Sequence, residues 1–394
     1  MKIAISNGPG WLAGGVELYL KALIPALIES GHEVAIGSSK QSPKEQYWPK
    51  DIASYNLSSN DSKFGLKGFF RWGADVHYIQ SIKDLRFWDR VADSKSVSVY
   101  FAHNYLSTCI SGQKFFKFPT IASCNRCMGL ACLIHYYPRR CGGLSPITMF
   151  RDFFKRSLLL QRVSMTDHVL THSESMLQEL KNNLNTDKIS KIPFYVDFSK
   201  DEVIRRISDN ELSIFFAARL EKEKGAHILL KSLPSVAHKV NKKLRVVIAG
   251  EGSQKPILES ISKDICAKEI DIKILFPGWL NHREKLNEFA RSNVFAMPCL
   301  WPEPLGMAPL EALCHGVPVV GFPGGYSEFL DDTKSSLVVD ERSVTAFAEA
   351  LCICLTDTKY MSNAKAQVPT MRRRFTMDNH IKSLNDIFNS CLNS

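Results

Sequence analysis

Two glutamates, Glu303 and Glu311, flank Gly306 shortly after the apolar run Val294–Met297. An apolar run, a short loop and a helical pattern predict a strand, a loop and a helix that begins near the glycine. At the carboxyl edge of a parallel sheet, such a loop and helix N-terminus bind phosphorylated ligands. Carboxylates there can accept hydrogen bonds from the hydroxyls of a sugar or ribose. The spacing therefore suits a phosphorylated sugar ligand, although by itself it equally fits two ordinary acids on a solvated helix.

The elements before this pair alternate between strands and helices. Strands are expected at 212–218, 244–249 and 271–276, and helices at 225–240 and 253–263. This βαβ order predicts a domain with a parallel sheet, which would place the two glutamates at its ligand-binding edge.

The first half of the chain opens in a similar way. A strand at 2–5, a glycine-rich loop at 8–15, a helix at 16–30 and a strand at 33–37 form a Rossmann-like beginning. The loop lacks the strict dinucleotide fingerprint, so a nicotinamide cofactor is not expected; the glycines either contact phosphate or let the helix approach the strand. Residues 41–72 look irregular. Further strands are expected at 76–79, 97–101 and 163–172, and a helix at 176–182.

Length and charge limit the classes of function. A chain of 394 residues is long enough for two domains, and its formal net charge of +10 favours anionic partners. No nucleic-acid-binding signature accompanies that charge, so nucleic acid is not an expected partner. No apolar run is long enough to span a bilayer, and the apolar start at 2–5 is too short for a secretory signal, so a cytoplasmic protein is expected.

Several separate segments, in the right order, resemble the retaining glycosyltransferases of family four, the glycosyl transferases group 1. The matching segments are 218–225, 249–252, 276–279, the block from Glu303 to Glu311, and Gly324–Gly325 with Glu328. The resemblance implies an α/β fold of the GT-B type, with two Rossmann-like domains facing across a cleft. The expected domains are an acceptor domain at 1–192 and a nucleotide-sugar domain at 193–366. Residues 367–394 are expected to form a C-terminal helix that crosses back to the first domain.

The resemblance also implies roles for residues of the second half. Arg219 and Lys224 would bind the donor diphosphate and neutralise the charge of the leaving group, without a metal ion or other cofactor in catalysis. Glu311 would bind the ribose hydroxyls and Glu303 the donor sugar. The amides of Gly306, Met307 and Ala308 at the helix N-terminus would contact sugar and phosphate oxygens. Surface charge at a helix start is the alternative for the two cations.

In the first half, the resemblance points to a loop histidine and two glycines. His103 follows the strand at 97–101 and matches the family's histidine near the reaction centre. Gly14 and Gly15 match a flexible loop that closes over the phosphates and the acceptor. His77 also follows a strand pattern, but a structural role is expected for it.

Five of the eleven cysteines lie between positions 109 and 141. Cys124 and Cys127 are spaced by two residues, with Cys109 and Cys141 on either side, a ligand pattern of structural zinc sites. Some members of the family share this arrangement. The four residues are therefore a candidate zinc site with Cys132 as a spare thiol, and reduced thiols in an irregular loop are the alternative.

The segment 147–162 carries four basic residues, one acidic residue and several large apolar residues. An amphipathic helix of this composition could attach reversibly to an anionic membrane surface, with 67–72 as a second basic and aromatic patch. The alternative is a helix whose apolar side packs on the domain's own sheet.

Together these features predict a retaining glycosyltransferase that moves a hexose-like sugar from a nucleoside diphosphate to a hydroxyl of a glycan or lipid-linked glycan. By analogy with the family, the acceptor would belong to bacterial cell-surface polysaccharide synthesis, such as lipopolysaccharide, capsule or exopolysaccharide, at the inner face of the membrane. The alternatives are a non-catalytic subunit that binds nucleotide sugars and an epimerase of the same fold. The residues needed for transfer, His103 and both glutamates, argue against the non-catalytic subunit.

Overall fold

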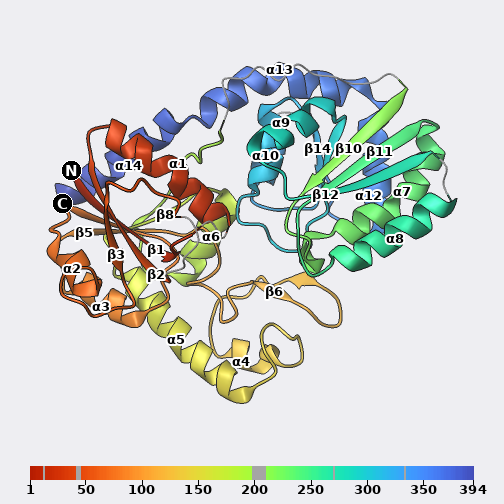
Figure 1. The fold of residues 1–394 in the computed structure, drawn as a ribbon. Helices are drawn as coiled ribbons and strands as arrows, with labels where there is room; N and C mark the ends of the chain where they lie inside the picture. The colour runs from red at the N-terminus through yellow and green to blue at the C-terminus, as the bar shows by residue number, and fades with distance from the viewer. Residues whose placement is uncertain (12–13, 41–45, 198–209, 269–270, 332–333) are drawn as a thin grey trace. The chain divides into compact units, whose positions relative to one another are not determined.

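The computed structural model describes residues 1–11, 14–40, 46–197, 210–268, 271–331 and 334–394 (Figure 1). Two of the loop residues expected at 8–15, Leu12 and Ala13, therefore lie outside the described part. The chain forms two compact units: unit 1 holds residues 1–120, 124–195 and 375–394, and unit 2 holds 121–123 and 196–374. Each unit is described by itself.

Unit 1 is built on a parallel sheet of seven strands, with β1 in its interior between β2 and β4. The strand order across the sheet is β3 (Ala53–Asn56), β2 (Glu33–Lys40), β1 (Lys2–Pro9), β4 (Val76–Ile79), β5 (Val97–Phe101), β8 (His168–Thr171) and β9 (Ile189–Lys191). The middle strands are buried on both faces, as their β-branched and aromatic residues require.

Helices connect these parallel strands, and the last helix of the chain belongs to unit 1. They are α1 (Gly15–Glu29), α2 (Leu66–Arg71), α3 (Leu85–Ala92), α4 (Ala131–Tyr136), α5 (Pro146–Ser164), α6 (Glu174–Asn183) and α14 (Met377–Leu392). Because α14 returns to unit 1, both chain ends lie near one another there (Figure 1).

Unit 2 has a parallel sheet of six strands whose first two βαβ steps follow the predicted alternation. Its order is β12 (Ile272–Gly278), β11 (Lys243–Ala249), β10 (Glu211–Ala217), β13 (Val294–Met297), β14 (Val319–Gly321) and β15 (Leu337–Val338). Its helices are the short 3-10 turn η1 (Lys222–Lys224), α7 (Ala226–Val240), α8 (Lys255–Lys268), α9 (His282–Arg291), α10 (Met307–Cys314), α11 (Ser327–Asp331), α12 (Val344–Thr356) and α13 (Thr358–Arg374). Two strands of two residues each, β6 (Phe115–Phe116) and β7 (Ala122–Ser123), complete the described elements.

The predicted α/β class is confirmed, and four local predictions change. The expected strand at 163–172 is shorter, because α5 continues to Ser164, with Val163 on its buried side, and β8 spans only His168–Thr171. The region 41–72 contains β3 and α2 instead of being wholly irregular. The predicted patch at 67–72 is α2, whose Phe69 is fully buried and therefore unavailable to a membrane. The units divide at 195/196 and 374/375 instead of 192/193 and 366/367.

No helix of the described residues is long and apolar enough to cross a bilayer.

Candidate functional site

The centre of the site in unit 2 is an ion pair between Lys224 and Glu303. Lys224 ends η1, and the next residue, Gly225, turns the chain into α7 with a φ of 78°. A β-carbon at Gly225 would lie 1.8 Å from the carbonyl oxygen of Pro298, so only glycine lets this turn pack on the end of β13. Glu303 stands in the loop between β13 and α10. The turn at Gly225 thus brings Lys224 next to the loop that carries Glu303.

Lys224 is almost completely buried, which makes its charge unusual. Burial alone lowers the pKa of Lys224, but the carboxylate of Glu303 outweighs that effect and raises the pKa above the ordinary value. The ammonium also lies 4.5 Å from the ring centroid of Trp301. Arg219, exposed on the loop after β10, is close enough for its charge to oppose that of Lys224. Two cations and one carboxylate therefore meet at the ends of β10 and β13.

The start of α10 supplies unpaired backbone amides beside Glu303. Gly306 caps the helix with a φ of 84°, and a β-carbon there would lie 2.6 Å from the Tyr326 ring. The first amides of a helix have no partner within it, so the N–H groups from Gly306 to Ala308 are available to an anionic or sugar oxygen. Met307 and Ala308 are both partly exposed. The predicted donor-binding amides are thus placed in the same loop as Glu303.

Glu311, one turn into α10, accepts a hydrogen bond of 2.6 Å from the ammonium of Lys285 on α9. Sequence reasoning missed Lys285, because it is one of several charges on a polar helix and nothing local marks its partner 26 positions away. The carboxylate of Glu311 is only about one-fifth exposed, so this pair lies in a partly desolvated place. A lysine here holds the carboxylate in one orientation.

A second residue missed from the sequence, Arg342, ties together the loops that follow β13 and β14. Its guanidinium donates to the carbonyl oxygen of Leu300 at 2.6 Å and to that of Pro323 at 3.5 Å. The loop after β14 also reaches the glutamate itself, since the amide of Gly325 donates to the carbonyl oxygen of Glu303 at 2.7 Å. A β-carbon at Gly325 would lie 1.9 Å from the carbonyl oxygen of Pro304. These contacts hold the backbone of Glu303 in place.

In unit 1, His103 follows β5 at the carboxyl edge of the sheet. Its Nε2 lies 2.5 Å from Oε1 of Gln80, a residue just beyond the end of β4. Burial, with smaller contributions from His172 and His380, holds the pKa of His103 well below its usual value, so the ring is neutral. A neutral ring that donates from Nε2 keeps Nδ1 as a hydrogen-bond acceptor. Sequence reasoning found His103 but not Gln80, which sets its tautomer.

A cluster of aromatic and histidine side chains in unit 1 packs around His103. The Tyr19 hydroxyl lies 2.7 Å from Nε2 of His380 on α14, and the Tyr19 ring is 5.2 Å from that of His103. Burial lowers the pKa of His380 to about 4 and that of His172 to about 3. The last helix of the chain therefore takes part in fixing the position of His103.

The predicted glycines Gly14 and Gly15 lie where α1 begins. Gly14 is the N-cap in an extended conformation with a φ of 179°, and Gly15 is the first residue of the helix. Inside the same first turn, Glu17 is buried and accepts a hydrogen bond of 2.8 Å from Asn7 at the end of β1. The glycines thus stand at the carboxyl edge of the unit 1 sheet, as His103 does.

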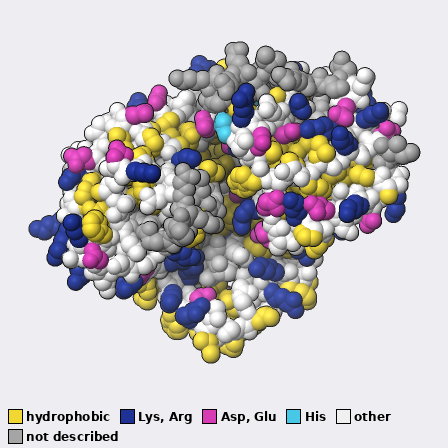
Figure 2. All heavy atoms as spheres, in the orientation of Figure 1, with side chains coloured by type: hydrophobic (Ala, Val, Ile, Leu, Met, Phe, Trp, Pro, Cys, Tyr) yellow, Lys and Arg dark blue, Asp and Glu magenta, His cyan; other side chains and the backbone are white. Residues whose placement is uncertain are grey.

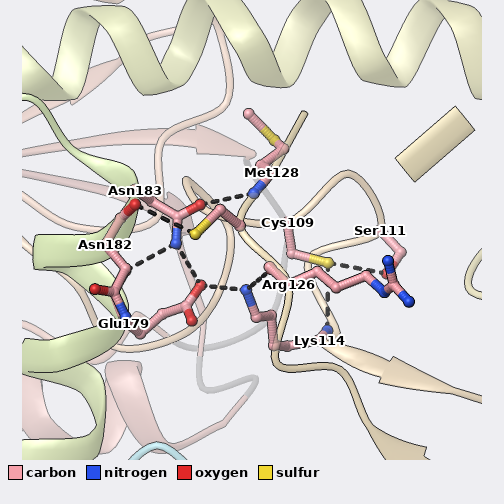
Figure 3. Close-up of polar contacts among 9 residues, drawn as sticks. Cys109, Ser111, Lys114, Arg126, Met128, Glu179, Asn182 and Asn183 are labelled. Atoms are coloured by element: carbon pink, nitrogen blue, oxygen red, sulfur yellow. Dashed lines mark hydrogen bonds and ion pairs between the residues drawn. The ribbon is translucent and has the colours of Figure 1, made fainter. Parts of the chain in front are cut away.

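The cysteine-rich segment of unit 1 is held by a buried lysine, not by the four predicted ligands. The Lys114 ammonium donates to the carboxylate of Glu179 on α6 at 2.5 Å and to the carbonyl oxygen of Arg126 at 2.6 Å (Figure 3). The Cys127 thiol is exposed and donates to the carbonyl oxygen of Asn182 at 3.3 Å. Among the described residues, no group of three or more His, Cys, Asp or Glu side chains is arranged to hold a metal ion.

Of the four predicted zinc ligands, Cys127 is exposed and hydrogen-bonded to Asn182, whereas Cys109, Cys124 and Cys141 lie near one another. Cys132 lies with Cys109, Cys124 and Cys141, close enough for each thiol to influence the others electrostatically. Burial raises the pKa of Cys141 to about 12 and those of Cys124 and Cys132 above their usual values. Zinc binding by Cys109, Cys124, Cys127 and Cys141 stays a prediction.

Two family models match successive parts of the chain. Residues 13–200 match the Glycosyltransferase Family 4 model, and residues 197–370 match the model of the glycosyl transferases group 1. The chain is 27% identical to an uncharacterized glycosyltransferase, MJ1607 of Methanocaldococcus jannaschii, over 98% of both chains. It is also 31% identical, over 46% of its length and 47% of the relative, to the GDP-mannose-dependent alpha-(1-6)-phosphatidylinositol monomannoside mannosyltransferase of Mycobacterium tuberculosis.

Solved structures show the same fold at low sequence identity. The HepE protein of Anabaena, in complex with UDP and glucose, superposes with a TM-score of 0.69 at 14% identity, covering 99% of this chain and 100% of that one. WaaG, a glycosyltransferase involved in lipopolysaccharide biosynthesis, superposes with a TM-score of 0.64 at 13% identity over 95% of this chain and 97% of its own. Both likenesses show the fold, with two Rossmann-like domains.

Proposed function

Since the chain belongs to the group 1, family 4 glycosyltransferases, we propose that it transfers a hexose-like sugar from a nucleoside diphosphate, with retention at the anomeric carbon. The observation that carries this proposal is the buried Lys224–Glu303 pair beside the α10 N-terminus. A buried ammonium that faces a loop of free amides suits a diphosphate, and a carboxylate next to it suits the hydroxyls of the attached sugar.

The roles follow from where each group stands. Lys224 and Arg219 neutralise the diphosphate as the bond between the anomeric carbon and the phosphate oxygen breaks. Glu303 and the amides of Gly306, Met307 and Ala308 bind the sugar and its neighbouring oxygens. Glu311, oriented by Lys285, binds the ribose. The two cations supply the positive charge that a metal ion would otherwise supply, so we propose catalysis without a metal ion.

Retention requires that the acceptor oxygen bonds to the same face of the anomeric carbon that the phosphate leaves. The acceptor hydroxyl gives its proton to the leaving phosphate oxygen, so no base on the far face of the sugar is needed. His103 is neutral and keeps an acceptor nitrogen, which suits a hydrogen bond to a sugar hydroxyl better than proton transfer. Gly14 and Gly15 would approach the phosphates and the acceptor from the start of α1.

The acceptor proposed here is a hydroxyl of a glycan or lipid-linked glycan in bacterial cell-surface polysaccharide synthesis. Two relatives support this class. One is named for its role in lipopolysaccharide biosynthesis, and the other acts on a phosphatidylinositol mannoside. A cytoplasmic enzyme that reaches such acceptors works at the inner face of the membrane as a peripheral protein.

The donor can be tested without knowing the acceptor. Melting temperatures are measured with UDP, GDP and ADP sugars in the presence of EDTA, because a ligand that binds the folded state raises the melting temperature. We expect one nucleotide class to raise it and the Glu303→Gln, Glu311→Gln double variant to lose that shift. Turnover of the same donor with extracted glycans then follows. No shift with any nucleotide sugar, or wild-type turnover by the double variant, would contradict the proposal.

A further inference from the structure

Helix α5 has two apolar faces, and only one of them is used by the fold. Met149, Leu159 and Val163 are buried, and Phe153 packs with the cluster around Tyr136. On the opposite side Ile147 is 79% and Phe154 63% exposed. The second apolar face is completed by Phe150 and Leu158, both about half exposed.

The helical spacing separates the two faces. Residues 147, 150, 154 and 158 recur at intervals of three and four positions, which places them on one stripe of the helix. The buried residues 149, 159 and 163 and the partly buried Phe153 fall on the opposite stripe by the same count. The fold therefore accounts for one stripe and leaves the other without a partner among the described residues.

The preceding helix, α4, extends the exposed stripe. Its Tyr136 is buried and packs with Met149, which fixes α4 on α5. Leu130 and Ile134, four positions apart on the other side of α4, are 74% and 72% exposed. Leu144, in the connection to α5, is 72% exposed. We call this surface the α4–α5 face, defined by Leu130, Ile134, Leu144, Ile147, Phe150, Phe154 and Leu158.

Basic residues border the α4–α5 face. Residues 104–164 contain nine Lys and Arg but a single acid, Asp152. Arg139, Arg140, Arg151 and Lys155 are exposed, and the Arg140 guanidinium lies over the exposed Phe118 ring at 5.1 Å. Figure 2 shows apolar and basic side chains together at the lower end of the view, where α4 and α5 lie in Figure 1.

We propose that the α4–α5 face binds the surface of an anionic lipid bilayer, with its apolar side chains in the acyl boundary and its basic residues at the lipid phosphates. An exposed apolar surface of this extent is the kind that marks an interaction site. The surrounding positive charge selects an anionic partner, and large apolar side chains between basic ones match the layered polarity of a membrane interface. The proposal deepens the proposed function, on which it rests for the lipid-linked acceptor that such a surface presents.

The test is flotation of the full-length protein with vesicles of phosphatidylcholine and phosphatidylglycerol at 7:3, without donor or acceptor. We expect wild-type protein to float with these vesicles but not with pure phosphatidylcholine, and to lose most of the bound fraction when salt rises from about 0.05 M to 0.5 M. Ile147→Ser with Phe154→Ser, or Arg151→Glu with Lys155→Glu, should each lower vesicle partitioning about tenfold or more. Arg156 is left unchanged, because it is largely buried.

Matched controls use residues outside the face. Phe64 is 61% exposed in the same unit, and Lys95 and Lys181 are exposed there as well. Phe64→Ser and the Lys95→Glu, Lys181→Glu pair should float as wild type does. Equal flotation of wild type and both face variants would overturn the proposal. Failure of the wild-type protein to float would also overturn it. If that non-floating protein is a dimer that Ile147→Ser with Phe154→Ser dissociates, the face binds a second copy of the chain instead.

The donor-induced melting shift separates this proposal from the proposed function. Face variants that no longer float should keep the full shift with the nucleotide sugar, because none of the substituted residues is among the proposed donor-binding residues. If the wild-type protein floats with the vesicles but shows no melting shift with any nucleotide sugar, only the donor assignment is contradicted.

Discussion

The ammonium of Lys224 bonds to the carboxylate of Glu303, although the two residues stand 79 positions apart in the chain. Each is attached to a different strand end, one after β10 and the other after β13, and neighbouring parallel strands bring them together. Removing one partner of a buried pair leaves the other charge without compensation. The pair is therefore a structural element of the site as well as a chemical one.

We predict that Glu303→Gln lowers turnover about ten- to a hundredfold, because the sugar loses a charge-assisted hydrogen bond of roughly 1.5–3 kcal/mol. Arg219→Ala and Glu311→Gln should instead weaken nucleotide binding by a similar factor, since these residues face the leaving nucleotide. Titration of the nucleotide by melting shift and measurement of kcat distinguish the two effects.

Glu349→Gln on α12, an exposed glutamate outside the site, is the matched control and should match wild type in both measurements. If Glu303→Gln changed nucleotide binding and left kcat untouched, the assigned roles of the two glutamates would have to be exchanged.

We predict that Gly225→Ala strongly destabilises unit 2 and abolishes donor binding. Two costs add there: a φ of 78° and a β-carbon 1.8 Å from the carbonyl oxygen of Pro298. Gly73 has a φ of 73° with nothing within 4 Å of the added atom, so Gly73→Ala isolates the first cost, about 1–2 kcal/mol. Chemical denaturation of both variants measures the difference. A Gly225→Ala protein no less stable than Gly73→Ala would contradict the close packing of this turn.

The alternating elements of unit 2 and the placement of Glu303 could be predicted, because strand and helix periods are local properties of the sequence. Local patterns could not reveal which distant residues form hydrogen bonds and ion pairs with one another. Lys285 joins α9 to α10, and Arg342 joins the loops after β13 and β14, through contacts made only when distant segments fold together. The same limit explains β3 (Ala53–Asn56), which has only two apolar residues, Ala53 and Tyr55, and becomes a strand by pairing with β2.

Helix α5 shows a related limit. The apolar residues of 147–162 were compatible with a buried helix or a membrane-binding helix, and the sequence alone could not choose. The structure shows a buried and an exposed apolar face on one helix, since Leu159 is buried while Phe154 is exposed. The sequence pattern identifies the apolar residues of the helix. It does not show which of them are buried, because burial depends on the elements that pack against the helix.

We predict that a maleimide at neutral pH modifies Cys127 well before Cys124, Cys132 and Cys141. The Cys127 thiol is exposed, whereas burial raises the pKa of the other three, so that they contain less of the reactive thiolate. Peptide mass spectrometry after timed labelling gives the order.

The same protein, purified without added metal, is analysed for zinc. About one equivalent, with Cys127 protected until a chelator is added, would confirm the ligand set predicted from the spacing. Rapid labelling of Cys127 with less than about a tenth of an equivalent of metal would contradict it.

We predict that acid destabilises unit 1 through its buried histidines. Burial lowers the pKa of His77 to about 4, and its two ring nitrogens have no hydrogen-bond partner among the described residues. Because the unfolded chain binds the proton more tightly, the stability contribution is fully present above about pH 6.5 and is lost as pH falls towards 4. For one such histidine the loss between pH 7 and pH 5 is about 2 kcal/mol.

His77→Leu should remove that part of the pH dependence while keeping neutral-pH stability, since the ring makes only aromatic contacts with Phe69 and Phe70. His238→Gln, at an exposed histidine of unit 2, should leave the dependence unchanged. Denaturant unfolding of wild type and both variants at pH 7, 6 and 5 measures the three slopes. If His77→Leu lost stability between pH 7 and pH 5 as steeply as wild type, His77 would not be one of the groups that protonate on unfolding, and the acid sensitivity would belong to His172 and His380.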